Sequence, residues 1–129
     1  MYKKKYIATS SAPKAIGPYS QAIEVDNLIF TSGQIPLCPK SGELISEDFE
    51  LQTEQCIKNL QSILANKELT LEHILKLTVF IVDLSKFDIV NKVFLKFFKG
   101  IPPARSVVEV SRLPKNAQIE IEGICYYEK

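Results

Sequence analysis

The sequence is poor in the residues that build metal sites and disulfide frameworks. It has a single histidine, His73, and three cysteines, Cys38, Cys56 and Cys125. One histidine cannot form a histidine-rich metal site, and the cysteine spacings contain no C-x-x-C pair and match no zinc pattern. An odd number of scattered cysteines favours free thiols in a reducing compartment. We therefore expect no metal and no disulfide.

The sequence also lacks long apolar runs and a strong imbalance of charge. The formal net charge of the 129 residues is +1, without the basic surplus typical of a dedicated nucleic-acid binder. No apolar stretch approaches the roughly 20 residues that span a bilayer, and no apolar core of a signal peptide is visible. These absences indicate a soluble, cytoplasmic protein without a membrane or nucleic-acid partner. The length fits a single domain over residues 1–129.

The first third of the chain is rich in strand-forming residues. Residues 5–9 read as a short strand, and residues 10–18 form an irregular loop with Pro and Gly. Residues 21–25 and 28–31 are separated by Asp26-Asn27, a pair that tolerates the positive φ of a tight turn. This segment predicts a β-hairpin.

An amphipathic helix is predicted after residue 48. Apolar residues recur at helical spacing between residues 51 and 64, with polar residues between them. Asp48 is the expected N-cap, and Asn66 is expected to take the left-handed position at the C-terminal end.

A second helix follows Ser85, which is expected to cap it together with Asp88. Apolar residues then recur at helical spacing as far as Gly100, where the helix is expected to stop. The members of this stripe are Phe87, Val90, Phe94, Phe97 and Phe98. Such a stripe is typical of a buried face rather than of a cofactor site.

The remaining segments complete an α+β pattern. Residues 76–82 are apolar on both faces, as in a central strand. Residues 106–112 and 118–127 alternate as strands around a turn at 114–116. Strands outnumber helices, with hairpins expected at both ends, so we expect a sheet with both helices on one face. The other apolar face would then be exposed in a monomer, which indicates an oligomer.

Common catalytic motifs are absent. There is no P-loop, no dinucleotide-binding G-x-G-x-x-G, no G-x-S-x-G and no H-E-x-x-H. A Ser–His–acid triad would depend on His73. That residue lies among apolar neighbours and is better interpreted as a packed or capping histidine.

Two charged residues have backbone contexts that suit a binding site. Glu120 alternates with Ile119 and Ile121, so its carboxylate points away from those two side chains. It is either solvated at an edge or placed in a cleft. Arg105 follows Pro102-Pro103, which stiffen the chain, and a guanidinium held in this way suits bidentate capture of a carboxylate. An ordinary surface arginine is the alternative.

Three further residues give weaker signals. Gly33 follows a predicted strand and would let a backbone N–H approach a ligand closely. The hydroxyl of Ser32 beside it would add a second donor. Tyr19, which follows Gly17-Pro18, has little specificity by itself.

Taken together, four separated segments resemble signatures of the RidA (YjgF) family. They are A-I-G-P-Y-S-Q-A at residues 15–22, T-S-G-Q-I-P at 31–36, Asp83-Leu84 with Phe87 and Val90-Asn91, and P-A-R-S-V-V-E-V-S-R-L-P-K at 103–115 followed by I-E-I at 119–121. The resemblance implies a chorismate-mutase-like α+β fold. It also implies a homotrimer, whose mixed sheets surround a central barrel and whose clefts lie between subunits.

The resemblance also implies a chemistry. Family members hydrolyse reactive enamines and imines, namely 2-aminoacrylate and 2-aminocrotonate or their 2-iminopropanoate and 2-iminobutanoate tautomers, which pyridoxal-phosphate enzymes release. The products are 2-oxo acids and ammonia, and no cofactor is needed. By this resemblance Arg105 would hold the substrate carboxylate, and Glu120 would orient the attacking water.

The same resemblance assigns supporting roles. The Gly33 amide and Ser32 would contact the polar end of the substrate. Tyr19 and Asn91 would close the cleft from a neighbouring subunit, and Tyr19 would assist proton transfer. The hydrolysis that the resemblance implies requires only positioning of the substrate and water and transfer of protons.

Two departures from the family pattern affect this site. Some relatives carry Cys two residues after the signature arginine, where this chain has Val107, and the loop at residues 99–101 is short. Two alternative functions stay open. One is an endoribonuclease or translation inhibitor, and the other is a non-catalytic 2-oxo acid or amino acid binding module, which would keep Arg105 without needing Glu120.

Overall fold

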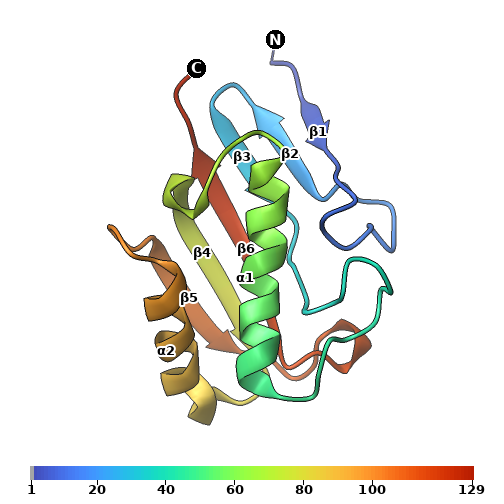
Figure 1. The fold of residues 1–129 in the computed structure, drawn as a ribbon, viewed down its shortest axis with the longest axis vertical. Coiled ribbons are helices and arrows are strands. Elements are labelled where there is room, and N and C mark those ends of the chain that lie inside the picture. The colour runs from blue at the N-terminus through green and yellow to red at the C-terminus, as the bar shows by residue number, and fades with distance from the viewer. Residues whose placement is uncertain (1) are drawn as a thin grey trace.

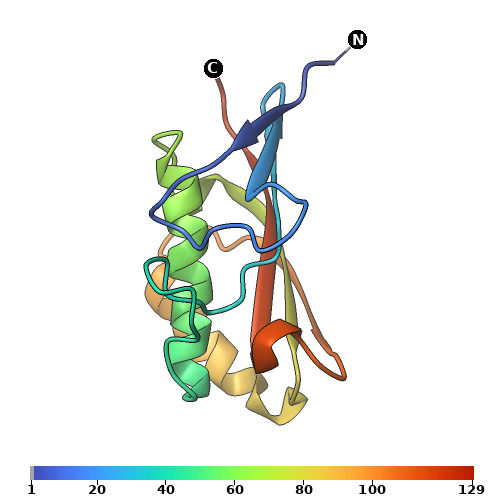
Figure 2. The same ribbon diagram turned by 90° about the vertical axis from the view of Figure 1, so that its right-hand side faces the viewer.

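The computed structural model describes residues 2–129, which form one mixed sheet with two helices packed on the same face (Figures 1 and 2). The strands are β1 (Lys5–Ile7), β2 (Ala22–Val25), β3 (Leu28–Thr31), β4 (Ile74–Ile81), β5 (Ala104–Glu109) and β6 (Ile119–Tyr126). The helices are α1 (Phe49–Ala65) and α2 (Phe87–Phe97), with short 3-10 helices η1 (Leu71–His73), η2 (Leu84–Lys86) and η3 (Pro114–Asn116). The predicted α+β class is confirmed.

The strand order is β1-β2-β3-β6-β4-β5. The predicted β2–β3 hairpin is present, and Asp26 in its turn has a φ of 52°. A second hairpin at the C-terminal end was the wrong expectation. β5 pairs in parallel with β4, because α2 forms the crossover that a parallel pair requires. β6 instead pairs with β3 and β4 and lies in the middle of the sheet.

α1 begins as predicted but ends differently. The side chain of Asp48 accepts a hydrogen bond from the backbone N–H three residues later, at 2.9 Å. Asn66 is right-handed, with a φ of −58°, so the expected left-handed role for it is wrong. Glu68 takes that role with a φ of 59°. The Leu69 N–H then bonds the carbonyl of Leu64 at 3.0 Å, which closes a Schellman-type end.

The start of α2 also differs from the prediction. Ser85 does not cap the helix, and Asp83 instead accepts hydrogen bonds from the backbone N–H and hydroxyl of Ser85, at 3.0 and 2.6 Å. This caps η2, and α2 continues directly from η2. The helix ends at Phe97, before Gly100.

The two faces of the sheet have different partners. Under α1 and α2 the strands contribute a closed apolar core, including Ile29, Leu77, Val79, Ile81, Ile119 and Ile121, all with 0% exposure. On the other face, no helix of the described residues covers the sheet (Figure 2). We call this the open face. It carries exposed or half-exposed apolar side chains, including Tyr6, Phe30, Val108, Ile124 and Tyr126. The predicted uncovered apolar face is confirmed.

His73 caps η1, because its Nδ1 accepts the backbone N–H of Thr70 at 3.1 Å. This confirms the capping interpretation. The three cysteines are free thiols, and Cys56 and Cys125 are buried. Over residues 2–129, neither helix has the length and hydropathy needed to cross a bilayer.

Candidate functional site

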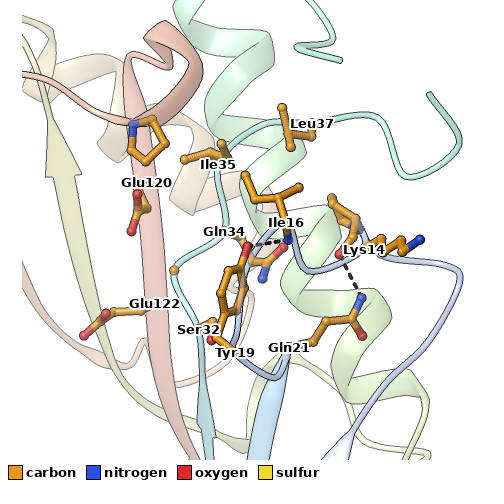
Figure 3. Close-up of a pocket in the computed structure, with 13 residues that line it drawn as sticks. Lys14, Ile16, Tyr19, Gln21, Ser32, Gln34, Ile35, Leu37, Glu120 and Glu122 are labelled. Carbon is orange, nitrogen blue, oxygen red and sulfur yellow. Dashed lines mark hydrogen bonds between the residues drawn. The ribbon is translucent and has the colours of Figure 1, made fainter. Parts of the chain in front are cut away.

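A cavity of about 430 Å³ lies beside β6 and the segment that follows β3. Figure 3 shows the side chains that face it. Glu120 and Glu122 project from β6, and Ser32 and Gly33 come from the end of β3. Tyr19 is contributed by the loop before β2. The cavity therefore brings together four of the six residues that the sequence nominated: Tyr19, Ser32, Gly33 and Glu120.

Glu120 is a half-buried carboxylate in this cavity. Ile119 and Ile121 on either side are in the core, so Glu120 points to the open face as the alternation predicted. Burial raises the pKa of Glu120, and the negative charge of Glu122 on the same face raises it further. A carboxyl group with a raised pKa suits proton transfer near neutral pH.

Gly33 is in close contact with the Glu120 carboxyl group. A Cβ at position 33 would lie 2.7 Å from the Cδ of Glu120. The backbone here is held against β6 by two hydrogen bonds between Gln34 and Ile121, at 2.8 and 3.0 Å. A Cβ at this position would require the Glu120 carboxyl group to move, so the glycine lets this backbone approach the carboxyl group where it now lies.

Ser32 is hydrogen-bonded to the segment that precedes β2. Its hydroxyl donates to the carbonyl of Ser20 at 2.6 Å, and its N–H donates to the carbonyl of Gln21 at 2.9 Å. The predicted contact of this hydroxyl with a ligand stays a prediction, and in the ligand-free chain its proton is directed to Ser20. Its oxygen lone pairs are left to accept.

Tyr19 lies at the rim of the cavity with about half of its surface exposed. Its hydroxyl oxygen accepts the backbone N–H of Ile16 at 3.2 Å, as the dashed line in Figure 3 shows. This contact holds the ring beside its own loop and leaves the hydroxyl proton free to be donated.

Sequence reasoning missed Gln21, a buried side chain behind this loop. Its amide oxygen accepts the Thr9 N–H at 2.8 Å, and its NH2 group donates to the Pro13 carbonyl at 2.8 Å. Gln21 thereby ties the loop to the start of β2. Glutamine is common on surfaces, so the signal that the sequence offered was the place of Gln21 in the A-I-G-P-Y-S-Q-A segment.

Arg105 occupies a different part of the molecule. It pairs with the buried Leu77 in the β4–β5 register and faces α2. Its Nη2 donates to Oδ1 of Asn91 at 2.8 Å, and its Cζ lies 5.3 Å from the Phe87 ring centroid and 4.9 Å from that of Phe94. Burial lowers the pKa of Arg105, although a guanidinium stays charged in proteins.

The candidate residues thus form two groups on opposite faces of the sheet. Arg105 and Asn91 line a groove of about 680 Å³ between α2 and the chain before β5. Glu120 lies in the cavity beside β6. One chain does not bring these groups together. Tyr19 and Asn91, both expected to close the cleft from a neighbouring subunit, belong to different groups.

Neither group offers an evident metal site. Within residues 2–129, no three or more His, Cys, Asp or Glu side chains lie close enough to hold an ion. Val107, at the position where some relatives have Cys, packs against the core beside β4. The first group therefore offers the guanidinium of Arg105, and the second offers the carboxyl group of Glu120 with its polar neighbours.

Comparisons with known proteins identify the family of this chain. A family model described as Endoribonuclease L-PSP matches residues 9–127. The chloroplastic Reactive Intermediate Deaminase A of Arabidopsis thaliana is 45% identical over 123 residues, which cover 95% of this chain and 66% of that protein. The structure of the YjgF gene product of E. coli has a TM-score of 0.92 and 46% identity, covering 96% of this chain and 99% of the other. E. coli TdcF with bound serine has a TM-score of 0.91 and 42% identity, with the same coverage.

The fold and the motif-bearing residues thus define a protein of the RidA/YjgF fold. The chain belongs to the RidA (YjgF) family, as its four sequence segments predicted. This family includes proteins named as reactive intermediate deaminases.

Proposed function

We propose that this chain hydrolyses 2-iminopropanoate and 2-iminobutanoate, and the 2-aminoacrylate and 2-aminocrotonate enamines that form them, to 2-oxo acids and ammonia. The observation that carries the proposal is the pair of complementary groups. One is a partly buried guanidinium with neutral contacts, and the other is a half-buried carboxyl group with a raised pKa. Such substrates carry a carboxylate to bind and an imine carbon to hydrate. The deaminase name of one relative and the serine bound to another also support a small amino-acid-like substrate.

The proposed active unit is a homotrimer with clefts between copies. The open face exposes apolar side chains that need a partner. Arg105 and Glu120 also lie on opposite faces of one sheet, so a second copy is the simplest way to bring them together. In this arrangement Arg105 and Asn91 come from one copy. Tyr19, Gly33 and Glu120 come from its neighbour.

The proposed reaction consumes one water and releases one ammonia. Arg105 holds the substrate carboxylate through two N–H groups. The enamine first takes a proton from solvent on its terminal carbon and becomes the protonated imine. Glu120 then removes a proton from water as the water oxygen bonds to C2 and the C=N bond becomes single. Glu120 or Tyr19 returns a proton to the nitrogen. The C–N bond breaks as the C2 hydroxyl gives its proton to the ionised Glu120 and becomes the carbonyl, so ammonia leaves and the 2-oxo acid forms.

A coupled assay tests this proposal. A pyridoxal-phosphate dehydratase generates 2-aminoacrylate from serine, and the loss of the enamine is followed with and without this chain. We expect accelerated loss for the wild type and loss of the acceleration in Arg105→Lys. An unaccelerated reaction would refute the deaminase proposal.

The family description makes ribonuclease activity the second candidate. The near-neutral charge disfavours it, because RNA binding draws on a basic surface. Cleavage of RNA by the wild type that also requires Arg105, without deaminase activity, would favour the ribonuclease. Binding of 2-oxo acids without turnover would favour the binding module.

A further inference from the structure

Three residues of α2 meet the guanidinium of Arg105 from one side of the helix. Phe87, Asn91 and Phe94 are spaced at i, i+4 and i+7, a spacing that places side chains along one face. α2 is the crossover between β4 and β5, so this face lies over the strand that carries Arg105.

The contacts of Arg105 restrict both the plane and the rotation of its guanidinium. Both ring centroids lie within the roughly 6 Å at which a cation is attracted to an aromatic face. The 2.8 Å bond to Asn91 uses one N–H of Nη2 and leaves the other donors free. Two rings and one hydrogen bond together hold the group in one orientation.

The groups that hold Arg105 are neutral. Within residues 2–129 the ion pairs involve Lys67, Lys92 and Lys96, and Arg105 takes part in none of them. Arg105 is partly buried, and no carboxylate of the described residues pairs with it. The position of the Arg105 guanidinium is therefore restricted by neutral groups, and its positive charge is left to bind an anion.

We infer that Phe87, Asn91 and Phe94 form a clamp that fixes the guanidinium of Arg105 before a ligand carboxylate binds. The three are positioning residues for the proposed deaminase site, and the inference rests on the proposed function for its ligand. Preorganising the donor removes the cost of ordering a long side chain on binding. Losing one ring contact should then weaken carboxylate binding by about 2- to 5-fold, the usual strength of one cation–π contact.

Phe87 is the residue to change. It is 38% exposed, whereas Phe94 is 8% exposed and belongs to the core. Phe87→Leu keeps an apolar side chain and removes the ring, whereas Phe87→Tyr keeps an aromatic ring. Leu84→Ala, on the adjacent η2, is the matched control because Leu84 is also exposed and lies outside the clamp. Asn91→Ala removes the hydrogen bond and gives a second, independent test.

The ligand-free protein can be tested by NMR with 15N-labelled arginine. The chain has only two arginines, Arg105 and Arg112, and Arg112 is exposed and serves as an internal reference. In the wild type and Leu84→Ala we expect slower guanidinium rotation and slower Nε–H exchange for Arg105 than for Arg112. In Phe87→Leu and Asn91→Ala, the guanidinium rotation and Nε–H exchange rates of Arg105 should approach those of Arg112. In Phe87→Tyr, which keeps the ring, the difference between the two arginines should remain. Unchanged rates in both Phe87→Leu and Asn91→Ala would overturn the clamp.

Ligand measurements separate the clamp from a purely structural role. Phe87→Leu should raise the Kd for 2-oxobutanoate and the KM for the imine by about 2- to 5-fold, with kcat within about twofold of the wild type. A fall in kcat with unchanged KM and Kd would contradict the clamp. If the wild type shows no deaminase activity, the proposed function fails, and the arginine exchange rates still decide the clamp.

Discussion

The helix-covered face of the sheet and its open face are built from the same strands but differ in their side chains and in what covers them. In β6, Ile119 and Ile121 enter a core with no exposed surface, while Glu120 and Glu122 alternate with them on the open face. The covered face is closed by α1 and α2 and supplies stability. The open face combines unpartnered apolar side chains with two carboxylates. A register slip of one residue would exchange the two sets, so the packing that buries the isoleucines also places the carboxylates.

The largest expected effect comes from removing the carboxylate of the open face. Glu120→Gln keeps the size of the side chain and loses the base, so kcat for imine hydrolysis should fall by about 10²–10⁴. Binding of a 2-oxo acid should persist, because the carboxylate anchor is elsewhere. Steady-state kinetics of the imine reaction and calorimetry with 2-oxobutanoate measure the two quantities. Full activity in Glu120→Gln would remove Glu120 from the mechanism.

Truncating the same residue type on each face tests the comparison directly. Ile29 is fully buried in β3, whereas Ile124 in β6 is 36% exposed on the open face. Ile29→Ala should cost about 2–5 kcal/mol of the free energy of unfolding. Ile124→Ala should cost the isolated chain less and should instead raise the dissociation constant of the trimer. Chemical denaturation at several protein concentrations and light scattering distinguish the two. A monomeric wild type at micromolar concentration would refute the shared site.

A methyl group at Gly33 tests how tightly the Glu120 carboxyl group is placed. Because the new Cβ would overlap that carboxyl group, Gly33→Ala should displace it. A displacement of about 1 Å can lower the rate about 10²-fold, while the free energy of unfolding should change much less than in Ile29→Ala. Crystallography of the variant and its kcat check this prediction. Wild-type kcat with an unmoved Glu120 would contradict it.

The smallest effect should come from the second carboxylate. Glu122 raises the pKa of Glu120 through its negative charge, so Glu122→Gln should lower that pKa. If the reaction needs ionised Glu120, its rate rises with pH around the pKa of Glu120. In Glu122→Gln that pKa is lower, so the rise in kcat/KM should occur at lower pH than in the wild type. The plateau above it should be unchanged. A pH profile of the wild type and the variant measures the shift, and Glu122→Asp, which keeps the charge, is the control.

Much of the fold could be predicted because periodicity and capping act locally. The α1 N-cap at Asp48 and the β2–β3 hairpin depend on neighbouring residues and were predicted correctly. The end of α1 was misplaced because Asn66, Lys67 and Glu68 all allow a tightened last turn, and the backbone pairing of Leu69 selects Glu68. Strand ends were shifted by one to three residues. The order of the strands depends on long-range pairing, which periodicity does not encode.

The residues of the candidate site were identified from sequence motifs, but their division into two groups in the folded chain could not be predicted. Alternation correctly placed Glu120 opposite Ile119 and Ile121. The sequence did not show that Arg105 faces α2, because that follows from its parallel register with Leu77. The contact of Ser32 with Ser20 and the role of Gln21 were not predicted for the same reason. Their hydrogen bonds join segments that approach one another only in the folded chain.

The position of β6 has a consequence for how this chain is made. β6 is the last strand to be synthesised, yet it lies between β3 and β4. Until it emerges, β3 and β4 each lack the strand that pairs with them in the complete sheet. Unpaired strand edges favour association with other chains. The sheet can therefore close only after β6 has been synthesised.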